Sequence, residues 1–268
     1  MIILQGGGLR FMALDFNLSE YGRMLKSAKD AGYNFISFSE FESVGGRAPG
    51  KYKCLLRHDV DIDLSAAFTM ANLESDLGIS STYFLMLRSP VYNLMARHNH
   101  VFVEKILDLG HSIGLHYDQG FDELRGLTCA QTKVLIEDES QWLEQQFNSR
   151  VAAVSFHQPG HAVLQGEICT GDRVNTYDHN RLAGFEYFSD SNRKFPLLQD
   201  GSSSSEAVFR GFSPRNLQLL IHPVWWVYDD ATTEAVWNRA IVSNLQIMQE
   251  QLLETERAYG FTREFIIR

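Results

Sequence analysis

The segment LLRHDVDID, residues 55–63, runs from an apolar stretch into three acids spaced two residues apart. In an extended chain, side chains two residues apart point to the same side. Carboxylates crowded on one side repel each other unless water or a cation lies between them. For Asp59 and Asp61 this pattern favours a functional role over a solvated loop pair. Asp63, directly before LSAA, is instead predicted to cap the helix that follows.

Other ionisable residues also follow short apolar segments that read as strands. They are His116 and Asp118 after SIGL, His157 after VAAVSF, Asp190 just after FEYF, and His222 after LQLLI. In two of these segments the histidine is followed by a proline within two residues, and proline ends a strand. Ionisable residues scattered over the surface are not expected to occur at the ends of strands so often.

Aspartate and histidine converging from separate strands form a ligand set suited to zinc or a similar divalent ion. Three protein ligands with one open position make a Lewis acid that also lowers the pKa of bound water to about 7. A further carboxylate can serve as general base, and a further histidine can protonate a leaving group. The residue types therefore predict hydrolase chemistry.

Several residues fit a structural role as well as a chemical one. His111, where a helix gives way to a strand, is predicted to be a turn histidine, and Cys54 lies in an apolar run and is predicted to be a core residue. The pair Trp225 and Trp226 fits the core and the wall of a sugar-sized pocket equally well.

Strands and helices that alternate along the chain must position these groups. The predicted strands are YKCLLRH, STYFLML, HSIGLH, VAAVSF, FEYF and LQLLI, and the predicted helices cover 17–32, 63–78, 100–110, 130–147 and 232–259. Such alternation implies a largely parallel sheet or a barrel, in which chemistry gathers at the carboxyl ends of the strands. The last helix is predicted to bury a stripe of Trp237, Ile241, Leu245, Met248 and Leu252.

Composition limits the classes of function. The chain has 268 residues and a net charge of −9, which argues against nucleic acid or an anionic membrane surface as the main partner. Its apolar runs are far shorter than the ~20 residues of a membrane span. Without a signal-peptide pattern, and with Cys54, Cys129 and Cys169 read as reduced thiols, we expect a cytoplasmic protein. We predict one domain over 12–268 and a tail over 1–11; QGGG within the tail is linker-like, and the tail is left out of the fold prediction.

The segments RHDVDID, GHSIGLHYD, SFHQPG, FEYFSDSN and LLIHP, in this order, resemble the polysaccharide deacetylase (NodB homology, carbohydrate esterase family four) superfamily. They extend over 57–223, and the branch they resemble most is associated with surface polysaccharide and O-antigen biosynthesis. The resemblance implies a distorted (β/α) barrel. It also implies metal-dependent removal of an acyl group, usually acetyl, from an amino sugar.

Carried over by motif, the resemblance assigns roles to single residues. Asp59 matches the general base, and Asp61 matches the metal-binding acid. His116 matches the first metal histidine of the HxxxH segment, and His222 matches the acid that protonates the leaving group. Asp190 falls in the segment that supports the catalytic histidine.

Two departures from the family pattern concern the third metal ligand. The second histidine of HxxxH would fall at Gly120, which cannot bind a metal, and the RxP segment reads HQP at 157–159. His157 is therefore favoured as the replacement ligand beside Asp61 and His116. Asp118 is the competing candidate.

The sequence thus predicts a zinc-dependent N-deacetylase acting on an amino sugar or an oligosaccharide. Tyr177, Trp225 and Trp226 are candidate sugar contacts. The alternatives are a metal-free barrel that binds sugar without cleaving it, and a deacylase or deformylase of a non-polymeric amide. The sugar, the identity of the metal and the oligomeric state are left open.

Overall fold

The computed structural model describes residues 15–44, 52–165, 168, 170–194 and 215–256. Within them, eight parallel strands form one sheet in the order β6-β5-β4-β3-β2-β8-β7, and β1 pairs with the start of β2 beside this path. The strands are β1 Tyr33–Phe35, β2 Tyr52–Val60, β3 Thr82–Leu85, β4 Ser112–Asp118, β5 Ala153–His157, β6 Val174–Asn175, β7 Phe185–Ser189 and β8 Asn216–Ile221.

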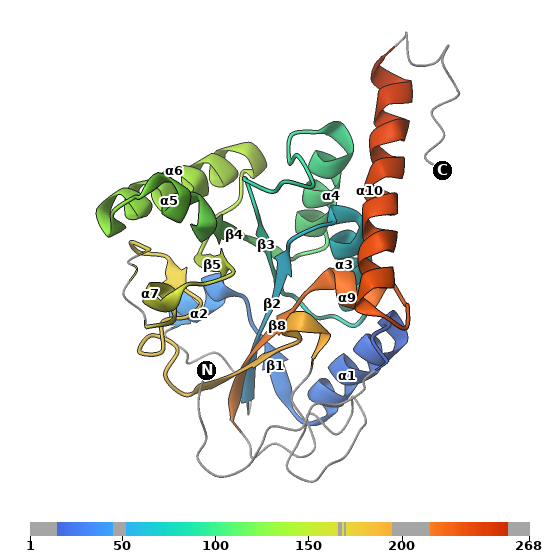
Figure 1. Cartoon of the computed structure of the whole chain (residues 1–268). Coiled ribbons are helices and arrows are strands. Elements are labelled where there is room, and N and C mark those ends of the chain that lie inside the picture. The colour runs from blue at the N-terminus through green and yellow to red at the C-terminus, as the bar shows by residue number, and fades with distance from the viewer. Residues whose placement is uncertain (1–14, 45–51, 166–167, 169, 195–214, 257–268) are drawn as a thin grey trace.

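The sheet is curled, and helices surround it (Figure 1). Among the described strands no pairing joins β6 to β7, so the curl is an open barrel. The predicted fold class, an α/β protein with a distorted (β/α) barrel, is confirmed. The domain bounds of 12–268 stay a prediction, since part of that range lies outside the described residues, as does the whole of 1–11.

Helices connect the strands and pack on the outside of the curl. They are α1 Leu18–Asp30, α2 Phe38–Val44, α3 Leu64–Asp76, α4 Arg97–Asp108, α5 Gln119–Arg125, α6 Cys129–Phe147, α7 His161–Leu164, α9 Pro223–Val227 and α10 Thr233–Thr255, with a 3-10 turn η1 at Ser191–Arg193. As predicted, Asp63 caps α3: its carboxylate accepts from the backbone N–H groups of Ser65 and Ala66. A side-chain acceptor at this position satisfies helix N–H groups that have no partner within the helix.

Strand β2 lies in the middle of the sheet, and eight of its nine residues are buried. Alternate side chains enter different clusters: Leu56 packs with α1 and α9, whereas Leu55 packs with Phe84 and Ala153 inside the curl. Arg57 and Asp59 follow Leu55 at spacings of two, so they continue its inner face. The inside of the barrel therefore changes from apolar to charged along β2.

The last helix differs from the sequence prediction. Helix α10 ends at Thr255, and 257–259 lie outside the described residues. The predicted apolar stripe is not buried: Ile241 and Met248, which belong to it, are about half exposed. The buried residues of α10 are Val236 and Ala240, which are not part of that stripe. The reason is placement, since the second half of α10 extends past the body of the protein (Figure 1).

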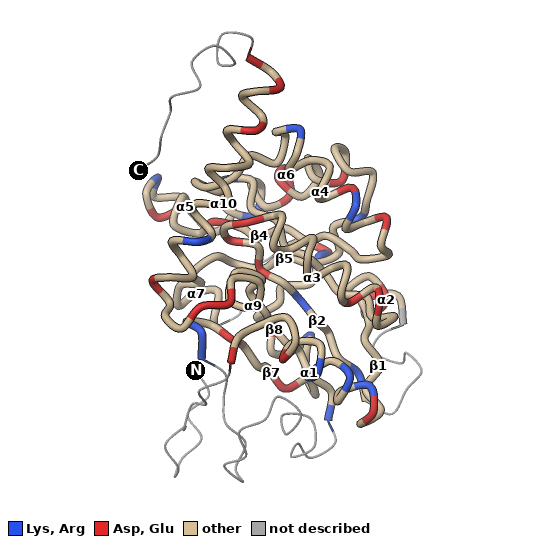
Figure 2. Tube along the Cα trace, turned by 90° about the vertical axis from the view of Figure 1, so that its right-hand side faces the viewer, with Lys and Arg blue, Asp and Glu red and all other residues tan. Residues whose placement is uncertain are grey.

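The charges and cysteines of the described part agree with a globular protein. Basic and acidic residues are interspersed along the chain (Figure 2), and no described helix is long and apolar enough to cross a membrane. Cys54 is buried in the core as predicted, and Cys129 is exposed; Cys169 lies outside the described residues.

Candidate active site

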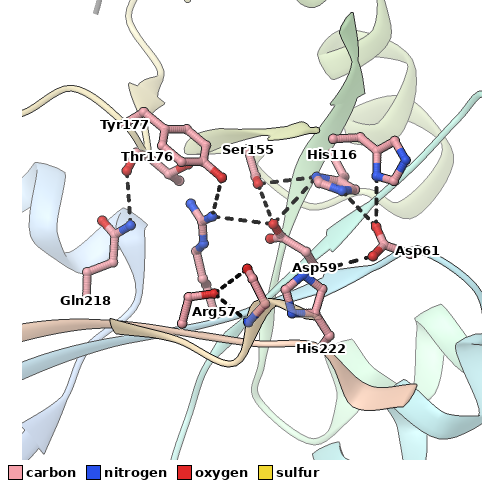
Figure 3. Close-up of polar contacts among 12 residues, drawn as sticks. Arg57, Asp59, Asp61, His116, Ser155, Thr176, Tyr177, Gln218 and His222 are labelled. Atoms are coloured by element: carbon pink, nitrogen blue, oxygen red, sulfur yellow. Dashed lines mark hydrogen bonds and ion pairs between the residues drawn. The ribbon is translucent and has the colours of Figure 1, made fainter. Parts of the chain in front are cut away.

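The carboxyl ends of β2, β4, β5 and β8 bring the predicted residues to one end of the barrel (Figure 3). Asp59 lies near the end of β2, and Asp61 follows that strand directly. The register between β4 and β5 places His116 beside Ser155 and Asp118 beside His157. His222 follows β8 and begins the short helix α9.

Asp61, His116 and His157 form a compact cluster. Each offers one ligand atom, and these three atoms lie within 4.8 Å of one another. The Oδ1 atom of Asp61 lies 3.0 Å from Nε2 of His116 and 3.1 Å from Nδ1 of His157. His116 is buried, whereas Asp61 and His157 are partly exposed, so the cluster opens on one side.

The chemistry of these donors fits a divalent cation. Two imidazole nitrogens approach one carboxylate oxygen, and a nitrogen lone pair can face that oxygen only if a proton or a cation lies between them. With ligand bonds of 2.0–2.2 Å, ligand atoms around tetrahedral zinc lie roughly 3.3 Å apart, close to the two distances observed. In the absence of metal, burial raises the pKa of Asp61. Hydrogen bonds with His116 and His157, with the charges of His116 and His222, outweigh burial and hold this pKa well below its usual range. The hydrogen bond to Asp61 in turn raises the pKa of His157.

A turn of unusual backbone geometry follows His157. Gln158 has a φ of 45°, in the left-handed region that few residues other than glycine adopt. The N–H of Gly160 donates to Oε1 of Gln119 over 2.8 Å, which ties this turn to the start of α5. The segment that reads HQP in place of RxP is therefore held with His157 facing Asp61.

Asp118, the competing third ligand, has a structural partner. Its carboxylate accepts from the N–H of Gly120 and caps α5. It is not part of the cluster that Asp61, His116 and His157 form among the described residues. The geometry thus favours His157 over Asp118, and the roles of both as ligands remain predictions.

Asp59 lies deeper than Asp61 and is 2% exposed. Its Oδ2 atom accepts from the Ser155 hydroxyl over 2.8 Å and lies 3.4 Å from Nη2 of Arg57. Its Oδ1 atom has no hydrogen-bond partner among the described residues. One oxygen is therefore held in place while the other is free to accept a proton.

His222 is held by Asp190. Nδ1 of His222 lies 2.5 Å from Oδ1 of Asp190, whose other oxygen accepts from the indole N–H of Trp226 over 2.8 Å. Nε2 of His222 lies 3.9 Å from Oδ2 of Asp61, beside the cluster. Burial lowers the pKa of His222, but the charge of Asp190 and the hydrogen bond to it, together with the charges of Asp61 and Asp59, outweigh burial and raise this pKa to about 9.

The three predicted sugar contacts are buried or partly buried, so they are less accessible to a substrate than exposed side chains. Trp226 is fully buried and Trp225 is 6% exposed; both belong to the core cluster beside α1, which agrees with the core alternative, and a role in sugar binding stays a prediction. Tyr177 is partly buried, and its hydroxyl accepts from Arg57 over 3.1 Å. His111 accepts from the N–H of Ser81 and is a buried structural histidine, as predicted.

Sequence reasoning missed Arg57 and Ser155, which both contact Asp59. Each stands two residues before a predicted site residue on the same strand, Arg57 before Asp59 and Ser155 before His157. Alternation along a strand places such pairs on one face, and this signal was available in the sequence.

Comparisons with known proteins give similarity in structure alone. No protein-family model and no curated protein matches the chain. A deacetylase from Streptococcus pyogenes, in complex with acetate, is 16% identical over 81% of this chain and 84% of its own, with a TM-score of 0.44. The chitin deacetylase of Colletotrichum lindemuthianum is 12% identical over 71% of this chain and 81% of its own, with a TM-score of 0.41.

A CE4 family pseudoenzyme from Bacillus anthracis is also similar, at 14% identity over 75% of this chain and 61% of its own, with a TM-score of 0.39. At such low identities and TM-scores, the function of this chain has to be inferred from its own residues.

Proposed function

We propose that the protein is a metal-dependent hydrolase of the polysaccharide deacetylase type, which removes an N-acetyl or other acyl group from an amino sugar. The observation that supports this most is the set of Asp61, His116 and His157 within 4.8 Å, with Asp59 and His222 beside it. A ligand set, a free carboxylate oxygen and a charged histidine are the parts that amide hydrolysis needs.

Asp61, His116 and His157 would hold the ion, for which zinc is the best candidate. When bound, such an ion acts as a Lewis acid that polarises the amide carbonyl and lowers the pKa of water. Oδ1 of Asp59 then accepts the proton that the attacking water loses as its oxygen bonds to the carbonyl carbon. Arg57 and Ser155 keep the other oxygen of Asp59 fixed during this transfer.

His222 completes the reaction. Asp190 raises its pKa, to about 9 in the metal-free protein, and so favours the protonated form; its Nδ1–H donates to Asp190, so the proton on Nε2 points toward the cluster. As the carbon–nitrogen bond breaks, Nε2 donates that proton to the amine that leaves. The products are a carboxylate, acetate in the usual case, and a free amino group on the sugar.

The substrate class is proposed on the motif resemblance: an amino sugar in a precursor of a surface polysaccharide such as O-antigen. Tyr177 is kept as a candidate contact because its ring borders Arg57 and it is partly exposed. Trp225 and Trp226 are not proposed as contacts, since they are buried.

Metal analysis of protein purified without chelator, together with acetate release from N-acetylated chitopentaose, tests the proposal. We expect near-stoichiometric metal, and acetate release that stops on chelation and returns with Zn²⁺. Asp61→Ala should lose metal and activity together, whereas the control Asp118→Asn should keep both. If the protein holds metal but releases formate or another acid, from formylated or otherwise acylated substrates, it acts on a different acyl group. Absence of metal, with chitopentaose bound but not cleaved, would indicate a sugar-binding barrel and overturn the proposal.

A further inference from the structure

Ser155 lies between two groups of the candidate site that are too far apart to share a hydrogen bond. It is fully buried on β5, and its side chain faces the inside of the barrel with that of His157. Its Oγ atom is 3.2 Å from Nδ1 of His116 and 2.8 Å from Oδ2 of Asp59 (Figure 3). The direct distance from Nδ1 of His116 to Oδ2 of Asp59 is 3.8 Å, too long for a hydrogen bond. The serine hydroxyl is therefore the link between them.

The direction of each hydrogen bond follows from the available protons. An ionised carboxylate only accepts, so the one proton of the Ser155 hydroxyl is donated to Asp59. Toward His116 the same oxygen can then only accept, which requires the proton of the imidazole to be on Nδ1. The lone pair of a neutral His116 is consequently on Nε2, the atom that lies 3.0 Å from Asp61.

We propose that Ser155 is a positioning residue, which fixes the tautomer and ring orientation of His116 for metal binding and holds the general base Asp59 at the same time. This inference rests on the proposed function. A histidine that binds a metal through one nitrogen is commonly fixed by a hydrogen bond at the other, and loss of that partner typically lowers metal affinity 10–100-fold. Here the hydroxyl of Ser155 is hydrogen-bonded both to a proposed metal ligand, His116, and to the proposed base, Asp59.

Zn²⁺ titration against a chromophoric chelator tests this without a substrate. We expect Ser155→Ala to weaken Zn²⁺ binding about 10–100-fold, and Ser155→Thr, which keeps the hydroxyl, to restore most of the affinity. The control is Ser140→Ala, since Ser140 is equally buried but donates to Ile136 within α6. It should bind Zn²⁺ as the wild type does. An affinity of Ser155→Ala within about twofold of wild type would overturn the inference.

Two-bond nitrogen–proton NMR spectra of the His116 ring give a readout that loss of packing alone would not change. In the wild type, Nδ1 should be protonated with and without Zn²⁺, whereas in Ser155→Ala the proton should distribute over both ring nitrogens of the neutral form. If Ser155→Ala does not fold, the wild type still decides, because a neutral His116 protonated on Nε2 would overturn the inference. A wild type that binds no Zn²⁺ but shows the Nδ1 proton would overturn the proposed function and leave the hydrogen-bond assignment standing.

Discussion

The guanidinium of Arg57 and the carboxylate of Asp59 form an ion pair of 3.4 Å inside the barrel, with 0% and 3% of their side chains exposed. They stand two residues apart on β2 and therefore share its inner face. Arg57 also donates to the hydroxyl of Tyr177 over 3.1 Å, and its charge lies 5.0 Å from the centre of that ring. The carboxylate of Asp59, the proposed general base, is thus held in a buried part of the protein by a cation from the same strand.

Removal of the cation alone should be costly. Breaking a buried ion pair by loss of one partner typically destabilises a protein by ~3–5 kcal/mol, because the other charge remains buried without compensation. We expect a loss of this size for Arg57→Met in the free energy of unfolding, measured by urea denaturation. The double variant Arg57→Met with Asp59→Asn should recover a large part of it. Strict additivity of the two single changes would show that the pair is not coupled.

The sequence predicts the site largely through where its residues stand on strands. Asp61 follows a buried strand, His157 ends one and His116 lies two residues before the end of another, and parallel strands bring their carboxyl ends to one place. The cap at Asp63 was equally predictable, because side-chain acceptors before a helix act locally.

What the sequence did not predict depends on contacts between strands and on the exposure of whole elements. The role of Ser155 depends on the register that sets it beside His116, and nothing within VAAVSF fixes that register. The tryptophan pair after His222 was undecided because an aromatic residue suits a core and a sugar pocket alike, and only packing against α1 settles Trp226. The stripe of α10 has helical spacing, but spacing does not say whether a neighbour covers it.

Asp59→Asn tests the general base. The amide cannot take the proton from water, and general base catalysis is typically worth 10²–10⁴-fold, so we expect kcat to fall by about that factor with N-acetylated chitopentaose as substrate. Metal content should stay near that of the wild type, because Asp59 is not among the three clustered ligand atoms. Retention of full activity would remove Asp59 from this role.

His157→Ala and Asp118→Asn distinguish the two candidates for the third ligand. His157 points Nδ1 at Asp61 over 3.1 Å, whereas Asp118 caps α5. We therefore expect the histidine variant to lose Zn²⁺ affinity and the aspartate variant to keep it, as measured by the chelator titration. Should Asp118→Asn lose the metal while His157→Ala retains it, the assignment would be reversed.

The pair of His222 and Asp190 predicts a titration at high pH. Burial lowers the pKa of His222. The charge and hydrogen bond of Asp190, together with the charges of Asp61 and Asp59, outweigh burial and raise this pKa to about 9 in the metal-free protein, against about 6.5 for an unperturbed histidine. Because the folded pKa is the higher one, the stabilisation from this pair is fully present below about pH 6.5 and is lost as the pH rises through about 9. Its size is on the order of 3 kcal/mol.

NMR titration of the His222 ring in chelator-treated protein measures this directly. Asp190→Asn removes the attracting charge and leaves the burial, so the pKa should fall below 9 toward or below the ordinary value. The matched control is Trp226→Phe, which removes a hydrogen bond to Asp190 but no charge, and should leave the pKa near 9. The wild type should have a larger free energy of unfolding than Asp190→Asn at pH 6, and this difference should be smaller at pH 10. An unchanged midpoint in Asp190→Asn would mean that another group holds the proton on His222.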